Sequence, residues 1–188
     1  AVIIDCGANS PEEQSAISHY ITTQSLTLCH LLCTHGHFDH IFGNQFLYEA
    51  YGLRPQLHED EAATYAAASE QMQMFLHRAL PLQIPAPGRL LQDGDEIAFG
   101  THTLRVIATP GHTPGGVCFY LEEESLLFSG DSLFRGSIGR CDLPGGNEEQ
   151  LLSALRTKIL TLPEQTRVYP GHGPATTIGR ERTGNPFF

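Results

Sequence analysis

The 188-residue chain contains no tryptophan, and its five cysteines form no Cys-x-x-Cys pair. We therefore expect the cysteines to be small core residues in a reducing compartment rather than members of disulfides, and we expect a cytoplasmic protein. Asp and Glu outnumber Lys and Arg by 21 to 11, which argues against nucleic acid as a partner because phosphate binding requires clustered basic residues. No apolar run approaches the length of a membrane span and no basic-then-apolar leader occurs, so we expect no membrane association.

The composition is that of an ordinary soluble globular protein, with 40% hydrophobic and 17% charged residues. A chain of this length fits a single domain over residues 1–188 and can bury a substantial core. It opens on Ala1-Val2-Ile3-Ile4, which reads as a strand already under way, so we expect residues to be missing upstream.

Short apolar runs alternate with helical patterns along the chain. Ser10 before Pro11 predicts a helix start, and we expect helices over residues 11–22, 41–51, 59–80 and 148–160. We expect strands over residues 2–4, 26–33, 55–58, 103–108, 116–121, 126–129 and 167–169, with a turn at 93–95. This pattern predicts a layered α/β protein with at least one mixed sheet.

The most informative segment is Thr34-His35-Gly36-His37-Phe38-Asp39-His40. Imidazoles and carboxylates are the ligands that divalent transition metals prefer. Residues two apart in an extended segment point the same way, so His35 and His37 can share one ion while Asp39 and His40 turn toward a second.

Three further segments present a His or Asp directly after an apolar strand, and together with the first they complete a metal site. They contain His112, Asp131 and His172. Catalytic groups gather on loops at sheet ends, so we expect His35, His37 and His112 to hold one ion, Asp39, His40 and His172 a second, and Asp131 to bridge them. Two divalent ions, two carboxylates and a bridging hydroxide leave about one positive charge for a developing oxyanion. Zinc is the first expectation, with iron or manganese as alternatives.

Other polar and apolar residues have two interpretations each. Asp5, after the first strand, is either a hydrogen-bond acceptor for a ligand histidine or a strand-end turn residue. Met72, Met74 and Phe75 could line a substrate mouth, but their helical context favours the core.

In these motifs the chain resembles the metallo-β-lactamase fold superfamily, and within it the single-domain glyoxalase II-like hydrolases. The segments that carry the resemblance are residues 34–40, 109–113, 129–131, 133–146, 169–174, 176–181 and 185–187. The resemblance implies an αββα sandwich with a dinuclear site at one edge, and a thioesterase acting on 2-hydroxyacyl-glutathione compounds. The family normally has strands before Val2, and its two-domain members carry a C-terminal helical domain that contacts glutathione, so we expect this chain to lack both.

The resemblance also implies a substrate contact. Arg140 stands where a basic residue of the family meets the thiol carrier, while Asp142 stands where the two-domain type has an aromatic residue. We expect Arg140 to bind a substrate carboxylate; the alternative is a salt bridge within its loop.

The resulting hypothesis is hydrolysis of a small-molecule thioester. The bridging hydroxide attacks the carbonyl, and Asp39 orients this nucleophile and accepts its proton. A thiolate with a pKa near 8.5 then leaves without a strong acid.

Other functions remain open at this point. One is a persulfide dioxygenase with a single iron held by two histidines and an aspartate. A phosphodiesterase, a β-lactamase and a metal-stabilised binding domain without activity are further alternatives.

Overall fold

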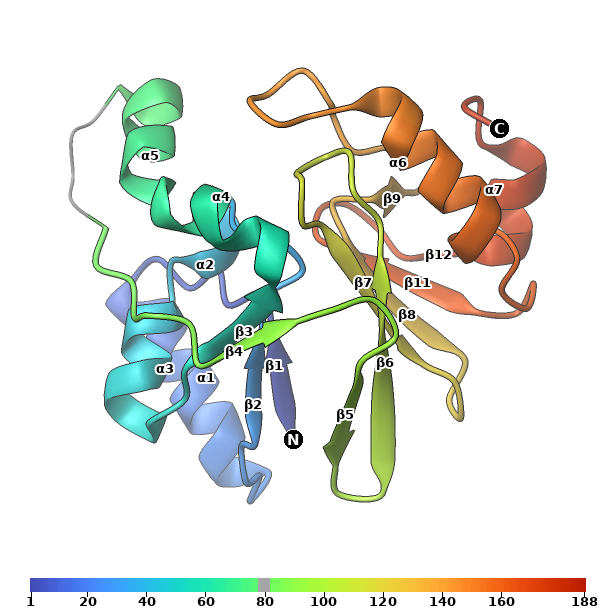
Figure 1. The fold of residues 1–188 in the computed structure, drawn as a ribbon. Helices are drawn as coiled ribbons and strands as arrows, with labels where there is room; N and C mark the ends of the chain where they lie inside the picture. Colours follow the sequence, from blue (N-terminus) through green and yellow to red (C-terminus); the bar gives the residue numbers. More distant parts are fainter. Residues whose placement is uncertain (78–81) are drawn as a thin grey trace.

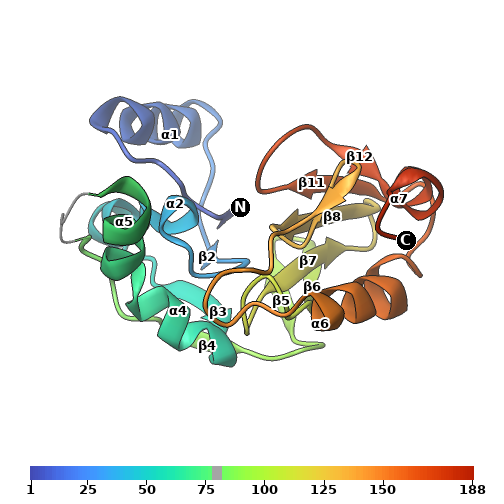
Figure 2. The same ribbon diagram turned by 90° about the horizontal axis from the view of Figure 1, so that it is seen from above.

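The computed structural model describes residues 1–77 and 82–188, and it places two large β-sheets face to face with helices on both outer sides (Figures 1 and 2). The first sheet is parallel and four-stranded, in the order β1 (Val2–Ile4), β2 (His30–Leu32), β3 (Pro55–His58) and β4 (Arg89–Leu91). The second is mixed and six-stranded, in the order β12 (Thr176–Thr177), β11 (Arg167–Pro170), β8 (Leu126–Gly130), β7 (Val117–Leu121), β6 (His102–Ala108) and β5 (Glu96–Phe99). The expected αββα sandwich is therefore confirmed.

The helices follow the same division between the two halves of the chain. Those beside the first sheet are α1 (Pro11–Thr23), α2 (Phe38–Ile41), α3 (Asn44–Tyr51), a 3₁₀ turn (Glu59–Glu61), α4 (Ala62–Ala66) and α5 (Ala68–Leu76). Those beside the second are α6 (Glu148–Ala154), which continues into a π-helical turn (Leu155–Ile159), and α7 (Ile178–Gly184). A small hairpin of β9 (Leu133–Phe134) and β10 (Ser137–Ile138) joins β8 to the loop before α6.

Strand β7 shows how the layers are held together. Side chains alternate between the two faces of a strand. Val117 and Phe119 therefore pack in the apolar cluster between the sheets, with Leu32 of the first sheet. Cys118 and Tyr120 point the other way, into the cluster that packs under α6 and α7. All five residues of the strand are buried, as expected for a strand covered on both faces.

Local sequence signals set several helix ends. Ser10 accepts a hydrogen bond from the Glu13 backbone N–H, and the Glu13 carboxylate accepts one from the Ser10 N–H, so the predicted helix start is a reciprocal capping box. Gly52 ends α3 in the left-handed region at φ 70°, a conformation that costs glycine little.

Other predicted elements are divided or shorter in the structure. The helix expected over residues 59–80 is wrong as one element: it is a 3₁₀ turn, α4 and α5, and residues 78–80 lie outside the described residues. The helix expected over 41–51 begins at Asn44, and the strand expected over 26–33 is limited to His30–Leu32. No helix within residues 1–77 and 82–188 combines the length and apolar character needed to cross a membrane.

Candidate metal centre

The seven predicted ligand residues come together where loops of the two sheets meet. The segment containing His35, His37, Asp39 and His40 runs from the end of β2 into α2. The other three residues lie in loops that follow β6, β8 and β11 of the second sheet: His112, Asp131 and His172. Gly130, at the end of β8, has φ 47° and a Cβ there would overlap Thr34, so only glycine allows these loops to approach so closely.

Three imidazoles form the first group. Ligand atoms of His35, His37 and His112 all lie within 4.8 Å of one another. His112 Nε2 is 3.0 Å from His37 Nδ1, and the ring centre of His35 lies 4.7 Å from that of His37. The three rings therefore turn nitrogen atoms toward one point.

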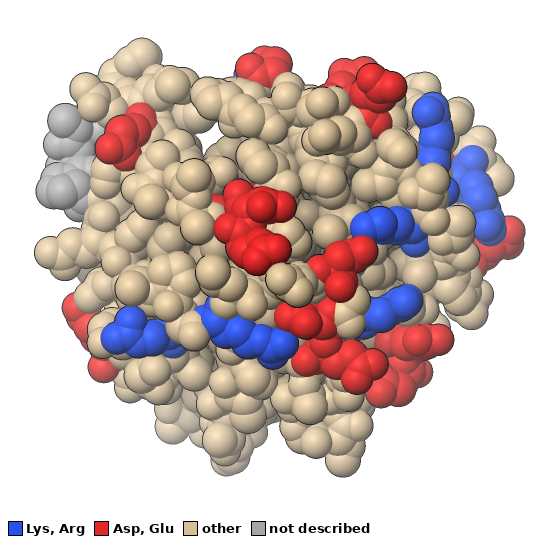
Figure 3. Space-filling model, in the orientation of Figure 1, with Lys and Arg blue, Asp and Glu red and all other residues tan. Residues whose placement is uncertain are grey.

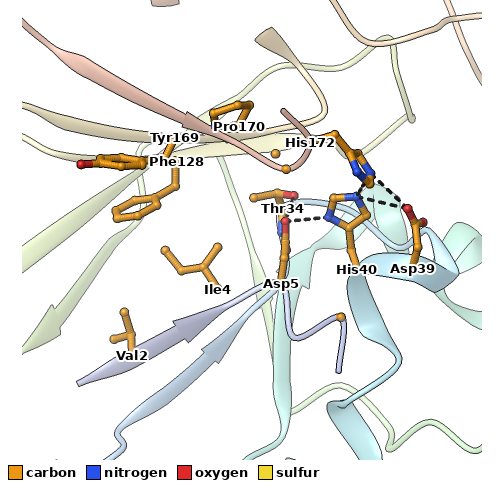
Figure 4. A pocket seen from close by; sticks show the side chains of 13 residues that line it. Val2, Ile4, Asp5, Thr34, Asp39, His40, Phe128, Tyr169, Pro170 and His172 are labelled. Carbon is orange, nitrogen blue, oxygen red and sulfur yellow. Dashed lines mark hydrogen bonds and ion pairs between the residues drawn. The ribbon is translucent and has the colours of Figure 1, made fainter. Parts of the chain in front are cut away.

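The second group consists of Asp39, His40 and His172, whose ligand atoms also lie within 4.8 Å of one another. His40 Nε2 lies 3.1 Å from His172 Nε2, and Asp39 Oδ2 lies 3.1 Å from the same His172 atom (Figure 4). The His172 side chain is 57% exposed, whereas His40 is buried, so this group opens to solvent on the His172 side.

The Asp131 carboxylate lies between the two groups. Its Oδ2 is 3.7 Å from His112 Nε2 in the first group and 3.6 Å from His172 Nε2 in the second. Its Oδ1 is 3.4 Å from His40 Nε2. One carboxylate therefore faces both sets of possible ligands.

In the three buried histidines of this centre, the Nδ1 atom contacts a neighbouring polar group. His40 Nδ1 is 3.0 Å from Asp5 Oδ2, and His112 Nδ1 is 2.7 Å from the Arg140 carbonyl oxygen. His35 Nδ1 is 3.1 Å from Thr34 Oγ1. Such contacts orient a ring so that its other nitrogen faces the centre.

Asp5 itself sits at the end of β1 in a left-handed conformation, φ 52°. Its Oδ1 accepts the Thr34 N–H at 2.7 Å and its Oδ2 accepts the Thr34 hydroxyl at 2.5 Å, as well as contacting His40 (Figure 4). The group of Asp5, His35 and His40 also satisfies the distances of a metal site. Because the Asp5 oxygens are already occupied by these partners, we place Asp5 outside the ligand set.

The donor atoms fit divalent cations. Among the described residues, His35 Nε2 and Asp131 Oδ1 are buried side-chain atoms without a hydrogen-bond partner, and buried polar groups of this kind call for an explanation such as an ion. Burial, with repulsion from the neighbouring imidazoles, lowers the pKa of His37 to about 4, and burial also lowers the pKa of His112. These rings are therefore neutral at pH 7, which is the form that binds metal.

The pKa of His40 is shifted in the opposite direction, and this shift also favours a bound cation. Burial alone would lower its pKa, but the carboxylates of Asp131 and Asp5 raise the pKa of His40 to about 10. The carboxylates thus stabilise positive charge at this position, and a divalent cation supplies such charge. Together with the fold, the clustered side chains imply a dinuclear metal site.

Glu61 is a residue of the centre that sequence reasoning missed. Its carboxylate is fully buried and accepts hydrogen bonds from the Gly36 N–H at 2.9 Å and the Gly115 N–H at 2.8 Å. These two amides belong to the loops that carry His35, His37 and His112. Glu61 stands in the acidic run 59–61 with no local signal of this role, since its partners are 25 and 54 residues away.

Arg140 lies at the rim of the centre. Its guanidinium donates to both carboxylate oxygens of Asp142, each at 2.7 Å, so the loop salt bridge considered as an alternative is present. The side chain also lines a cavity with His37, His112 and Asp131. The structure thus adds a backbone contact, the Arg140 carbonyl to His112, that sequence reasoning did not anticipate.

Comparison with known proteins places this geometry in a family. Residues 1–172 match the Metallo-beta-lactamase superfamily. The probable metallo-hydrolase YqgX of Bacillus subtilis is 40% identical over 175 residues, 93% of this chain and 82% of that protein. The hydroxyacylglutathione hydrolase GloC of Haemophilus influenzae is 36% identical over 190 residues, 100% of this chain and 86% of that protein.

Similar solved structures support the same family. The B3 metallo-beta-lactamase BLEG-1 superposes with a TM-score of 0.90 at 40% identity, covering 100% of this chain and 88% of its own. TTHA1623 in a di-iron-bound form gives 0.87 at 41% identity, with 98% and 88% covered. ETHE1 from Myxococcus xanthus gives 0.79 at 29% identity, with 98% and 72% covered. By sequence, fold and clustered histidines, the chain belongs to the metallo-β-lactamase superfamily.

Proposed function

We propose that this chain is a metal-dependent hydrolase that cleaves small-molecule thioesters of the 2-hydroxyacyl-glutathione type. In this proposal His35, His37 and His112 hold one ion, Asp39, His40 and His172 hold the second, and Asp131 reaches both. The observation that carries it is the position of Asp131, within 3.7 Å of histidines from both groups. Zinc is the proposed metal because imidazole and carboxylate ligands suit it; the di-iron form of a 41%-identical neighbour supports iron as the alternative.

When bound, divalent ions at such a site lower the pKa of water toward neutrality and polarise a carbonyl oxygen. The residues of the chain supply position and a proton acceptor. Asp39 is only partly buried and faces His172 across 3.1 Å, so its carboxylate can orient the attacking water and accept its proton. Asp5 and the Arg140 carbonyl hold His40 and His112 in the required orientations.

Water and the thioester are the two reactants of the proposed hydrolysis. The water oxygen bonds to the acyl carbon, the carbon–sulfur bond breaks, and the products are a carboxylic acid and a thiol. Thiols have a pKa near 8.5, so the sulfur leaves as a thiolate without a strong acid beside it. The relative named hydroxyacylglutathione hydrolase, 36% identical along the whole of this chain, supports a thioester as the substrate class.

A thioester panel with the zinc-loaded protein tests the proposal. Release of thiol is measured with S-acyl-glutathione substrates, against protein stripped of metal by a chelator. We expect Asp131→Ala to lose bound metal and activity together, while Glu123→Gln, an exposed acidic residue in the β7–β8 turn, retains both. Thiol release no faster than that of the metal-free protein would refute the thioesterase, and full activity of Asp131→Ala would refute its bridging role.

The second candidate is the persulfide dioxygenase with a single iron, favoured by the similarity to ETHE1 at 29% identity. It would use a single ion, which leaves ligand residues of the two groups without a metal to hold. Oxygen uptake with a persulfide substrate, together with one iron per chain by metal analysis, would support it. Nitrocefin in the same panel tests for the activity in the name of the 40%-identical BLEG-1.

A further inference from the structure

A groove lies beside the candidate metal centre, between helices α4 and α5 and the loop before α6, which have no role in the proposed chemistry. The cavity at the centre, about 480 Å³, is lined by His37, His112 and Asp131. A second cavity of about 410 Å³ adjoins it between α4, α5 and the loop before α6 (Figure 1), where the space-filling view shows a hollow in the surface (Figure 3). The two cavities share the lining residues His37, Phe75 and Leu143, so they adjoin at these side chains.

The walls of this second cavity, which we call the side groove, are mostly apolar. They include the apolar residues Ala63, Ala67, Met74, Phe75, Pro114 and Leu143, together with four polar residues, which are His37, Thr64, Glu70 and Gln71. Of these, Gln71 is occupied: its Oε1 accepts the Phe38 N–H at 3.1 Å and its Nε2 donates to the Thr64 carbonyl at 2.7 Å. A volume of this size and an apolar lining are typical of ligand pockets.

Helix α5 turns apolar side chains into this groove rather than into the core. Met72 is only 6% exposed, as expected for a core residue, but Met74 is 57% and Phe75 38% exposed. The core interpretation of Met74 and Phe75 is therefore wrong. Phe75 faces Phe38, beside the ligand His37, at 6.0 Å between ring centres, so the apolar surface continues up to the metal ligands.

The charge of the described lining of the side groove disfavours an anionic ligand group. Among residues 1–77 and 82–188, its lining includes no Lys or Arg, and the one acidic residue is the exposed Glu70. Arg140, which lines the adjoining cavity, is paired with Asp142. Among the described lining residues, the charged side chain that a terminal carboxylate of a substrate arm would meet is the like-charged Glu70.

We infer that the side groove binds a neutral, apolar arm of the substrate. For the thioester proposed above, on which this inference rests, that arm is an acyl group of several carbons without a terminal charge. The scissile carbonyl would lie at the centre beside His37, and the acyl chain would extend along Phe75 and Leu143 toward α4.

A chain-length series on a constant thiol tests this inference. N-acetylcysteamine thioesters from acetyl to octanoyl are compared by kcat/KM. Each methylene buried in an apolar site raises binding about three- to fourfold, so kcat/KM should rise by that factor per methylene until the groove is filled. The adipoyl thioester, with its terminal carboxylate, should be at least tenfold poorer than the hexanoyl thioester of equal length.

Two substitutions on one helix separate groove binding from general effects. Ala63→Phe places a large side chain in the groove, whereas Ala66→Phe places it on an exposed position of α4 outside the lining. The first should abolish the advantage of octanoyl over acetyl, and the second should preserve it. Equal chain-length dependence in both variants would overturn the inference.

A binding measurement distinguishes failure of this inference from failure of the thioesterase. Calorimetric titration uses the non-hydrolysable thioether S-octyl-N-acetylcysteamine with the metal-loaded protein. We expect binding with a negative heat-capacity change that Ala63→Phe weakens at least tenfold. Hydrolysis of thioesters without any chain-length preference refutes the apolar arm alone. Absence of hydrolysis with groove-dependent thioether binding refutes the thioesterase alone.

Discussion

Glu61 contacts the two loops of the first histidine group through their backbone amides, and none of its hydrogen bonds among the described residues goes to a proposed ligand side chain. Its buried carboxylate joins Gly36 and Gly115, one amide from each loop that carries the first group of histidines. Burial raises the pKa of this carboxyl, and the two backbone amides act in the opposite direction. Removal of the acceptor would leave both buried amides unpaired, which costs about 1–3 kcal/mol each.

We therefore expect Glu61→Ala to weaken binding of the first ion by about 10- to 100-fold, the usual effect of losing a group that orients ligands. Glu61→Gln keeps one acceptor oxygen but faces the other amide with an NH₂ group, so its loss should be smaller. Competition with a chromophoric chelator measures both affinities. Glu59→Gln, an exposed acid in the same turn, is the control; an affinity of Glu61→Ala equal to that control would contradict the role.

His37 and Glu61 illustrate which residues of the site can be predicted from the sequence and which cannot. His35, His37, Asp39 and His40 are close in sequence, so their spacing alone predicts a shared site. Each of His112, Asp131 and His172 follows an apolar strand and a glycine-containing turn, which is a local signal too. Glu61 and the Arg140 carbonyl act through contacts between distant segments, and no local pattern reports such contacts.

At the scale of elements, the end of β6 is tied to the π-helical turn that follows α6. Lys158 Nζ lies 2.8 Å from Asp93 Oδ2 and 3.1 Å from the carbonyl oxygen of Ala108, the last residue of β6. Asp93 Oδ1 accepts the Ala108 N–H at 2.7 Å. Because the loop with His112 starts after Ala108, this ion pair anchors the base of that loop.

The ion pair predicts a pH dependence of stability. Burial opposes ionisation of Asp93, but Lys158 and the Ala108 amide outweigh it and lower its pKa. A lowered folded-state pKa stabilises the fold above the unfolded-state value of about 3.9. That stabilisation disappears as the pH falls through the folded-state pKa.

Asp93→Asn should therefore lower the free energy of unfolding at pH 7 by up to about 1 kcal/mol, a modest value because the pair is half exposed. Urea unfolding of both proteins at several pH values measures this. The difference should be constant above about pH 5 and decrease as the pH falls below the unfolded-state pKa of about 3.9 and through the lower folded-state pKa. A difference that persists unchanged at low pH would exclude the ion pair as its cause.

The helix ends that a local sequence signal marks can be predicted from the sequence, whereas those set by tertiary packing cannot. Ser10 and Gly52 are local signals that can be read from the sequence. Helix α1 begins directly after Ser10, and α3 ends at Gly52. The break between α4 and α5 falls at Ala67, where neither Gly nor Pro marks it. There Tyr65 and Ala68 pack in one cluster with Cys33, and a Cβ on Gly36 would lie 2.6 Å from the Tyr65 nitrogen. The loop with His35 therefore lies against α4.

For the whole molecule, the metal centre links the two sheets. The first sheet supplies the ligand run after β2, and the second supplies His112, Asp131 and His172. An ion that binds only the folded chain adds stability of about 2.7 kcal/mol at a hundredfold excess over its dissociation constant.

Removal of metal by a chelator should therefore lower Tm, by about 5–10 °C for a chain of this size. Differential scanning calorimetry with and without zinc measures the shift. Asp131→Ala, which should not retain metal, is expected to unfold at a temperature that the chelator barely changes. An equal Tm for loaded and stripped wild-type protein would show that the ions do not stabilise the fold.

The distribution of the ligands along the chain also governs when the protein can acquire its ions. Domains are synthesised from the N-terminus, so Asp39 and His40 leave the ribosome long before their partner His172, which follows β11. The group of His35, His37 and His112 is available earlier, but Asp131 completes it only after β8. In the proposed site, the ligand set of the second ion is therefore complete only once β11 and His172 have been synthesised, and a nascent chain that ends before β11 contains six of the seven proposed ligand side chains.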